Sequence, residues 1–336
     1  MGLQVNYFIR NIPKSHFVHQ GFARAIKART IKPSPVWLPF ILIPYYCIFT
    51  LPYYFFKIER RSKLLCEGLA GLYFARILKL VRKDIFVVYH DADALFYMTY
   101  PHLRGIKKRY FDFFLRCIDK VISDSVISKN LIQDSLSLSY EIPVVYPFID
   151  IQRYDFNTKK EARDILYIGR LSPEKNLLNL LRAFQLVQSE FKNTNLWIVG
   201  DGPQKAQLKN EVQKLGLKNV HFEGWRTNFS KYTRRSVIGY NVSVFEPFGC
   251  SGLEYVLSGV VPLLGKRNGN AEVLKTDVLI TNQDDYGAIA NSMIGIIRMS
   301  DENRSSLLND LRETTLNYNE KNQCDKFKES FERITK

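Results

Sequence analysis

In the second half of the chain, short apolar runs alternate with stretches in which apolar residues recur every three or four positions. The runs at 165–168, 196–199 and 260–264 are continuous, as in strands that are buried on both faces. After Asn176 the spacing is helical: Leu177, Leu180, Leu181, Phe184 and Val187. Strands are also expected at 220–222 and 237–245, and a helix at 253–257. Strands separated by helices predict a parallel, doubly wound α/β sheet.

The first half shows the same alternation less regularly. It predicts strands at 5–9, 63–66, 85–89, 121–123 and 144–145, with helices at 18–28, 69–80 and 104–116. We expect the connection between two Rossmann-like domains at 147–154. The predicted domains cover 1–150 and 151–317, with a C-terminal helix at about 318–336 that packs back on the first. Ligands of such folds bind at the carboxyl ends of the strands.

Residues 36–56 are the most apolar part of the sequence and carry no charge, a length sufficient to cross a bilayer. Pro39, Pro44 and Pro52 interrupt this segment, and each removes a helical hydrogen bond. An unsatisfied backbone is costly in hydrocarbon, which argues against a clean span. Three interpretations stay open: a patch lying on a membrane surface, a buried or inter-domain segment, and a true membrane span.

Charge is distributed unevenly between the halves. Residues 1–160 hold 24 Lys and Arg against 12 Asp and Glu, whereas the remainder holds 24 against 21. The first half is therefore expected to meet an anionic partner, and charge alone does not choose among nucleic acid, anionic lipid and phosphorylated substrates. The five cysteines are widely separated, which is typical of reduced thiols in a cytosolic protein.

A pair of carboxylates frames the most informative motif. Glu-Pro-Phe-Gly-Cys-Ser-Gly-Leu-Glu occupies 246–254, between a predicted strand and a predicted helix. Backbone amides near Ser251, Gly252 and Leu253 would point at a bound anion, and the glycines permit close approach of a ligand. The pattern favours a pyrophosphate site flanked by carboxylates that bind sugar hydroxyls. The alternatives are a surface turn for Glu246 and a helix-start residue for Glu254.

Two other strand-to-helix loops carry polar residues suited to phosphate. Gly-Arg-Leu-Ser-Pro-Glu-Lys occupies 169–175, where Arg170 and Lys175 are spaced to reach one phosphate group. Gly-Asp-Gly-Pro at 200–203 lacks the third glycine of a dinucleotide fingerprint. We therefore interpret it as a tight turn at the edge of the site.

The order Gly-Arg-x4-Lys, Val-Gly-Asp-Gly-Pro, Phe-x-Gly and Glu-Pro-Phe-Gly-x3-Leu-Glu resembles the large family of retaining GT-B glycosyltransferases, over about 163–310. The resemblance implies two Rossmann-like domains facing a central cleft, an N-terminal acceptor-side domain and a C-terminal donor-binding domain. Pro247 departs from the family, which usually has Gly there. By this resemblance the donor-binding residues are Gly169, Arg170, Lys175, Gly200, Gly202, Phe248, Gly249, Cys250, Ser251, Gly252, Leu253 and Glu254.

The catalytic set implied by the resemblance is His90, Arg170, Lys175 and Glu246. Arg170 and Lys175 would hold the donor diphosphate, Glu246 the hydroxyls of the transferred sugar and Glu254 those of the ribose. His90, in Phe-Val-Val-Tyr-His-Asp at 86–91, is similar to a family histidine that faces the donor sugar. A core histidine is the other interpretation. The family's Gly-rich loop after the first strand is not visible, and residues 9–15 occupy its place.

The implied reaction is sugar transfer from a UDP- or GDP-linked donor with retention of anomeric configuration, without a metal or other cofactor. The expected partners are the nucleotide sugar, a lipid-linked or glycan acceptor and an anionic membrane surface, not nucleic acid. The expected location is cytoplasmic, peripheral on the cytoplasmic face of a membrane. Two other functions stay open: a sugar-nucleotide epimerase of the same fold, and a non-catalytic basic membrane adaptor.

Overall fold

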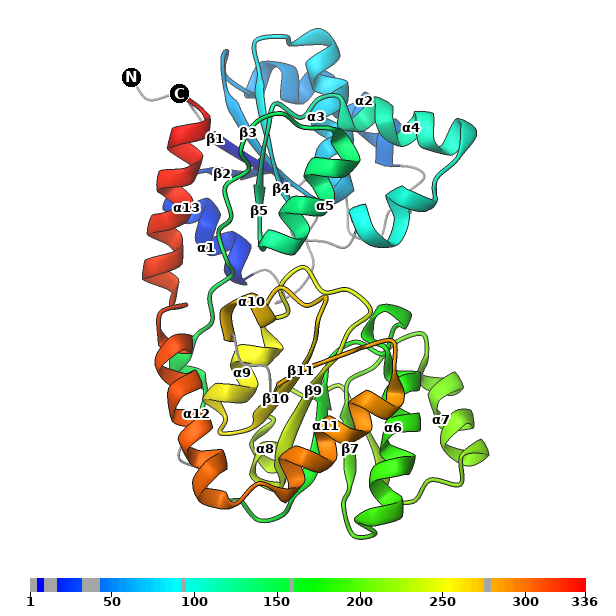
Figure 1. Ribbon diagram of the computed structural model, residues 1–336. Coiled ribbons are helices and arrows are strands. Elements are labelled where there is room, and N and C mark those ends of the chain that lie inside the picture. The colour runs from blue at the N-terminus through cyan, green and yellow to red at the C-terminus, as the bar shows by residue number, and fades with distance from the viewer. Residues whose placement is uncertain (1–4, 9–16, 32–42, 92–94, 157–159, 275–278) are drawn as a thin grey trace. The chain divides into compact units, whose positions relative to one another are not determined.

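The computed structural model describes residues 5–8, 17–31, 43–91, 95–156, 160–274 and 279–336 (Figure 1). The chain divides into two units. Unit 1 consists of Met1–Phe148 with Glu320–Lys336, and unit 2 is Ile149–Asn319.

Unit 1 is built on a parallel sheet in the order β2-β1-β3-β4-β5. Its strands are β1 (Val5–Phe8), β2 (Arg29–Ile31), β3 (Lys63–Glu67), β4 (Phe86–Asp91) and β5 (Lys120–Ser123). Its helices are α1 (Phe17–Ala25), α2 (Ile43–Lys57), α3 (Gly68–Val81), α4 (Gly105–Leu115), α5 (Val126–Leu136) and α13 (Glu320–Ile334), with short turns η2 (Leu95–Thr99) and η3 (Tyr100–His102).

The sheet of unit 1 has an apolar layer on each face, because successive strand residues point to opposite sides. Leu64 and Cys66 of β3 lie in a core cluster with residues of α3 and α4. Leu65, between them, lies in a second cluster with Phe22 of α1 and Phe327 of α13. The C-terminal helix thus completes the core of the N-terminal unit.

Unit 2 is built on a parallel sheet in the order β11-β10-β9-β6-β7-β8. Its strands are β6 (Asp164–Ile168), β7 (Leu196–Val199), β8 (Val220–Gly224), β9 (Ser236–Asn241), β10 (Val261–Gly265) and β11 (Ile280–Thr281). Its helices are α6 (Leu177–Glu190), α7 (Lys205–Lys214), α8 (Ser230–Arg235), α9 (Ser251–Leu257), α10 (Ala271–Leu274), α11 (Tyr286–Arg298) and α12 (Asp301–Leu316), with turns η4 (Ile151–Arg153) and η5 (Pro173–Lys175).

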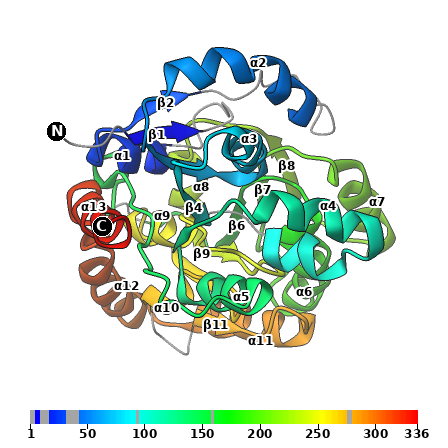
Figure 2. The same cartoon turned by 90° about the horizontal axis from the view of Figure 1, so that it is seen from above.

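The strand order of unit 2 reverses between β6 and β9. From β6 the chain continues outward to β7 and β8 on one side, and then returns to β9 on the other side. In open α/β sheets this reversal leaves a crevice at the carboxyl ends of the two central strands. The loops that follow β6 and β9 carry the predicted phosphate and carboxylate motifs, so the topology brings them together. Figure 2 shows α9 and β9 beside each other.

The predicted doubly wound sheets are confirmed, with local differences. The strand expected at 144–145 is wrong: Val144 forms only an isolated bridge to Ser123, since Pro143 and Pro147 lack backbone donors. The strand expected at 237–245 ends at Asn241, and the chain then turns into the site. The expected break at Pro52 is also wrong, because α2 continues through it. Pro52 is exposed, where water can reach the carbonyl left without a donor.

Candidate functional site

Lys175 and Glu246 meet at the point where the strand order reverses. Lys175 ends the loop after β6, and Glu246 follows β9. The ammonium of Lys175 forms an ion pair with the carboxylate of Glu246, which also accepts a 3.2 Å hydrogen bond from Ser243. The two side chains are 23% and 15% exposed. Glu246 is therefore a mostly buried partner of a lysine, not a surface turn.

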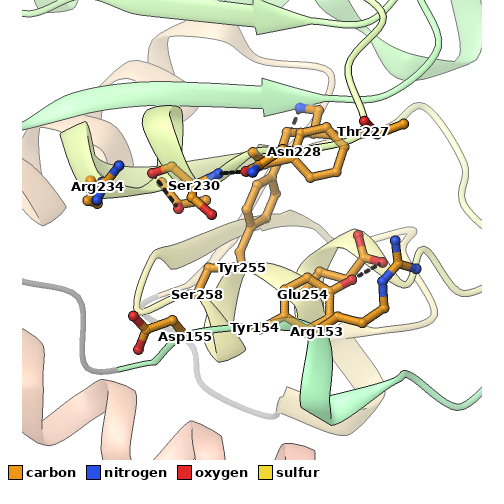
Figure 3. A pocket seen from close by; sticks show the side chains of 13 residues that line it. Arg153, Tyr154, Asp155, Thr227, Asn228, Ser230, Arg234, Glu254, Tyr255 and Ser258 are labelled. Atoms are coloured by element: carbon orange, nitrogen blue, oxygen red, sulfur yellow. Dashed lines mark hydrogen bonds between the residues drawn. The ribbon is translucent and has the colours of Figure 1, made fainter.

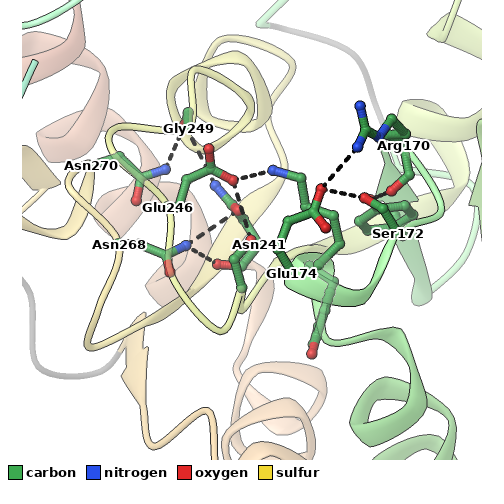
Figure 4. A network of polar contacts seen from close by, with 12 residues as sticks. Arg170, Ser172, Glu174, Asn241, Glu246, Gly249, Asn268 and Asn270 are labelled. Carbon is green, nitrogen blue, oxygen red and sulfur yellow. Dashed lines mark hydrogen bonds and ion pairs between the residues drawn. The ribbon is translucent and has the colours of Figure 1, made fainter. Parts of the chain in front are cut away.

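Arg170, which follows β6, lies beside Glu174 and Ser172 at the same edge of the sheet (Figure 4). The side chain is 70% exposed, and its guanidinium lies 3.6 Å from the carboxylate of Glu174, which also accepts a hydrogen bond from Ser172. The loop is anchored by its backbone, because the amide of Val244 donates to the carbonyl of Glu174 at 2.8 Å. Arg170 is thus a cation on a fixed loop, available to an anionic ligand.

The loops after β6 and β7 touch each other through backbone atoms. The amide of Gly169 donates to Val199, and the amide of Leu171 donates to Asp201, both at 3.0 Å. Gly200 has φ +150°, and a Cβ there would lie 1.8 Å from the carbonyl oxygen of Gly169. Only glycine fits such an approach. The tight turn predicted at 200–203 therefore acts to join two loops of the site.

Two asparagines from the segment after β10 hold the end of β9 and the loop between the paired glutamates (Figure 4). The side-chain amide of Asn270 donates to the carbonyl of Gly249 at 2.6 Å, and that of Asn268 donates to the carbonyl of Asn241. Gly249 has φ +80°, and a Cβ at Gly252 would lie 2.4 Å from the Asn270 amide. The two glycines of the motif thus make room for a turn and for Asn270.

Glu254 lies in the first turn of α9, as predicted, on the wall of a cavity of about 450 Å³ (Figure 3). The phenol of Tyr154 donates a 2.7 Å hydrogen bond to its carboxylate. Burial raises the pKa of Glu254, and the Tyr154 hydrogen bond and the charge of Arg153 oppose that rise. Thr227 and Asn228 face this pair across the cavity in Figure 3. The cavity is lined mainly by polar side chains that can bind hydroxyl groups.

A second cavity of about 390 Å³ adjoins the first, since Ile168 and Phe229 line both. Gly169, Arg170 and Gly200 also line it. At its rim Trp225, which follows β8, is 65% exposed. The two cavities together offer a cation, a carboxylate and aromatic side chains within one unit, which suits an anionic ligand with a flat ring and hydroxyl groups.

Not every predicted donor residue presents a side chain to this site. Phe248 and Leu253 are 2% and 0% exposed, so their side chains belong to the core. The amide of Gly252, expected to be free, donates to the carbonyl of Gly249 at 3.1 Å. Cys250 and Ser251, at the start of α9, are partly exposed. Gly202 lies against the backbone of Leu171, where a Cβ would approach to 2.5 Å.

His90 ends β4 in unit 1, and its ring is in the interior. Its Nε2 lies 2.8 Å from the Asp124 carboxylate, and both side chains are nearly inaccessible to solvent. Phe22 and Phe327 pack edge-on against the ring. Burial alone would lower the pKa of His90, but Asp124 and Glu67 raise it, and the net shift is upward. This environment is the one expected of a core histidine, and contact with a sugar stays a prediction.

Sequence patterns did not single out Tyr154, Asn268 or Asn270. Tyr154 and Asn270 each donate to a residue of the paired-glutamate motif from a distant part of the chain, whereas Asn268 donates to Asn241 at the end of β9. The signal that was present is Asn-Gly-Asn at 268–270, which follows β10 closely at the same edge of the sheet. Within the residues that the structure describes, no group of three or more His, Cys, Asp and Glu side chains is placed to hold a metal ion.

Comparison with known proteins gives this site a context. The sequence model of the family described as "Glycosyl transferases group 1" matches residues 148–314. The lipopolysaccharide core biosynthesis glycosyltransferase LpsD of Rhizobium meliloti is 31% identical over 148 residues, 43% of this chain and 42% of that protein. The alpha-monoglucosyldiacylglycerol synthase of Streptococcus pneumoniae is 26% identical over 268 residues, 72% of this chain and 60% of that protein. This chain thus spans less than two thirds of either relative.

Among solved structures, Anabaena Alr3699/HepE in complex with UDP-glucose is similar to this chain. The TM-score is 0.79 at 16% identity, and the match covers 99% of this chain and 100% of that one. A match of this extent at low identity shows the fold. The chain has the GT-B fold, as the sequence predicted.

Proposed function

We propose that this chain moves a sugar from a nucleotide-sugar donor to an acceptor hydroxyl. Over residues 148–314 it belongs to the group 1 glycosyl transferases. The observation that carries the proposal is the Lys175–Glu246 pair at the reversal of strand order, beside the open guanidinium of Arg170. A carboxylate and two cations at this crevice match what a sugar joined to a diphosphate requires.

Arg170 and Lys175 would bind the donor diphosphate. Arg170 can offer two parallel N–H donors to one phosphate, whereas Lys175 offers a compact charge held in place by Glu246. Negative charge grows on the diphosphate as the glycosidic bond breaks. Cations that are already in place stabilise that charge without reorganisation, so their contribution is larger in the transition state than in the ground state.

The two glutamates would bind hydroxyl groups. Glu246 would accept from the transferred sugar, and Glu254 from the ribose in the cavity that it shares with Tyr154. Charge-assisted hydrogen bonds of this kind contribute about 1.5–3 kcal/mol each. The neighbouring cavity, with Trp225 at its rim, would take the base. A UDP-linked donor is supported by the solved relative, which was crystallised with UDP-glucose.

Retention of configuration is part of the proposal. The departing phosphate would accept the proton of the acceptor hydroxyl on the same face of the sugar, so that no side-chain base is needed there. His90 would orient the sugar. The support is the order of the motifs at Arg170, Lys175, Glu246 and Glu254, which matches the family, and the placement of these residues around one sheet edge.

We propose a lipid-linked saccharide or glycolipid as acceptor, at the cytoplasmic face of an anionic membrane. Two relatives support this, since their names describe lipopolysaccharide core biosynthesis and alpha-monoglucosyldiacylglycerol synthesis. The excess of basic residues in 1–160 is suited to an anionic surface. Across the described part of the chain, no helix is both long enough and apolar enough to cross a membrane.

The test is a donor and acceptor screen. The purified chain is incubated with UDP- and GDP-linked hexoses, with and without a bacterial lipid extract, and nucleotide release and anomeric configuration of the product are measured. We expect acceptor-dependent nucleotide release that Glu254→Ala lowers at least tenfold by removing the proposed ribose contact. Conversion of the donor to an isomeric nucleotide sugar without acceptor would instead identify an epimerase. Absence of both binding and release with every donor contradicts the proposal.

A further inference from the structure

Helix α2 presents a row of large apolar side chains to solvent. Tyr45, Phe49, Tyr53 and Phe56 are 61%, 85%, 57% and 85% exposed. At 100° per residue these positions share one side of the helix. On the opposite side, Tyr54 packs edge-on against Phe74 of α3, with ring centroids 4.8 Å apart. The helix is thus anchored to unit 1 by one side, and its aromatic side is open to solvent among the residues that the structure describes.

Helix α4 presents a second row with the same character. Ile106, Tyr110 and Phe113 are 84%, 41% and 38% exposed, at the spacing of one helical face. Phe114, which follows, is buried in the core of unit 1. Ile106, in the first turn of α4, therefore contributes little apolar burial to the described part of unit 1 and is available to an external apolar partner.

The two rows belong to one surface, because α2 and α4 both pack on α3. Tyr73 of α3 contacts the row on α4, with its ring centroid 6.1 Å from that of Tyr110. Tyr45, near the N-terminal end of α2, is close enough to influence Tyr110. Burial raises the pKa of Tyr110, the hydrogen bond with Tyr73 opposes that rise, and Tyr45 adds to it.

Basic residues surround this surface. Residues 57–61 and 104–116 hold eight Lys and Arg against two acidic residues, Glu59 and Asp112. The eight are Lys57, Arg60, Arg61, Arg104, Lys107, Lys108, Arg109 and Arg116. Aromatic side chains that can enter the headgroup region, rimmed by cations, complement an anionic lipid surface in both shape and charge.

We propose that α2 and α4 together form a docking surface for a bilayer that contains anionic lipid, with Phe49, Phe56 and Ile106 as its inserting side chains. The inference deepens the proposed function and rests on it, because a lipid-linked acceptor requires the enzyme to work at a membrane. It extends the contact beyond the apolar segment 36–56 to α4. Of that segment, residues 36–42 lie outside the described residues.

Vesicle co-sedimentation of the full chain tests the surface. The probes are vesicles of phosphatidylcholine alone and of phosphatidylcholine with phosphatidylglycerol, at low and high salt. We compare the wild type with three variants: Phe49→Ser with Phe56→Ser, Ile106→Ser, and Lys107→Gln with Arg109→Gln. The matched control is Leu186→Ser with Tyr286→Ser, which removes apolar side chains that are 42% and 46% exposed in unit 2.

Binding of the wild type should require phosphatidylglycerol and weaken with salt. The double Phe variant should bind about tenfold more weakly or worse, and Ile106→Ser several-fold more weakly, because each loses apolar area that would be buried in the membrane. The Gln variant should lose the salt dependence in part, and the control should bind as the wild type does. Wild-type protein that stays in the supernatant, or an Ile106→Ser variant that binds normally, overturns the proposal.

Two further measurements separate this inference from its rivals. Gel filtration without lipid shows whether the same surface joins two copies of the chain; a dimer that the Phe variants dissociate would overturn membrane docking. Thermal protection by UDP reports on the donor site alone. Loss of vesicle binding with intact UDP protection refutes only the docking surface, whereas vesicle binding without any nucleotide binding refutes the proposed function.

Discussion

Tyr154 donates a 2.7 Å hydrogen bond to Glu254, a residue one hundred positions later in the chain. Tyr154 lies directly after the turn η4, in the first residues of unit 2, and Glu254 is in the first turn of α9. Arg153 adds a positive charge next to the same carboxylate. The segment before β6 therefore fixes the orientation of Glu254, a proposed donor-binding carboxylate.

Replacing Tyr154 with Phe should weaken nucleotide binding with little effect on kcat. Glu254 would lose the hydrogen bond that holds it, at a cost of about 1–2 kcal/mol, or roughly a five- to thirtyfold increase in Kd for UDP. Because that bond lowers the pKa of Glu254, its removal should also move the acidic decline of UDP affinity to higher pH. Calorimetric titration of UDP across pH measures both effects. Tyr286→Phe, at an exposed tyrosine of α11, is the control; equal affinities and equal pH profiles would contradict the role of Tyr154.

Arg170→Ala should separate function from stability. The side chain is 70% exposed and its nearest acidic partner is 3.6 Å away, so the free energy of unfolding should change by less than about 0.5 kcal/mol. Turnover should fall roughly ten- to a hundredfold through loss of a charge-assisted contact to the diphosphate. Arg182→Ala on α6, 46% exposed and paired with Glu211, is the matched control and should keep wild-type turnover. Turnover equal to that of the control would remove Arg170 from the site.

Local patterns were sufficient to predict the strands and helices around the site. The buried strand at 165–168 and the helix after Asn176 were each visible in a few adjacent residues, and the motif at 246–254 occurs between a strand and a helix as expected. Helices α5, α11 and α12 were not predicted. Their N-terminal caps, Ser125, Asp285 and Ser300, were readable as capping residues. The helical spacing after Ser125 and Ser300 is weak, whereas Ile289, Met293 and Ile296 of α11 have clear helical spacing.

Contacts between distant segments could not be predicted from such patterns. Tyr154 reaches Glu254, and Asn270 reaches Gly249, only because the fold of unit 2 brings these distant segments together. The surroundings of His90 depend on Phe327, which belongs to the C-terminal helix. The position of His90 at the end of a strand indicated a site residue, whereas the packing partners that bury it are contributed by opposite ends of the chain.

The His90→Gln variant tests whether His90 stabilises the core of unit 1. The pKa of His90 is raised in the folded chain, so its stabilising contribution is complete below the unfolded pKa of about 6.5 and is lost as pH rises through the folded pKa. The stability difference between wild type and variant, from urea titrations, should therefore be larger at about pH 6 than at about pH 9. Asp124→Asn should abolish the same pH dependence.

The catalytic interpretation of His90 requires a different result. A folded His90→Gln variant with unchanged melting temperature and unchanged UDP affinity, but reduced turnover, would indicate contact with the sugar. A pH-independent stability difference would contradict the core interpretation.

Lys160 provides a prediction about alkaline stability, because its ammonium is held inside unit 2. It donates to the carbonyl of Thr233 at 2.8 Å and to that of Ser258 at 3.1 Å, and so ties the segment before β6 to α8 and to the end of α9. Burial, with a contribution from Arg304, lowers its pKa to about 8. The unfolded chain therefore binds one more proton than the folded chain between about pH 8 and the usual lysine value of about 10.4.

The extra proton on the unfolded chain determines how the free energy of unfolding changes with pH. Protonation favours the unfolded state, so the contribution of Lys160 to the free energy of unfolding should rise with pH through this window, by at most about 1.4 kcal/mol per pH unit. Lys160→Met lacks the titrating group, and the wild-type minus variant difference should therefore increase from about pH 8 to about pH 10. Because the wild type and the variant share all other titrating groups, this difference removes the contributions of tyrosines and cysteines that titrate in the same pH range. Lys214→Met, at an exposed position of α7, should show a flat difference. A flat difference for Lys160→Met as well would mean that Lys160 stays fully charged at alkaline pH, held by the carbonyls of Thr233 and Ser258.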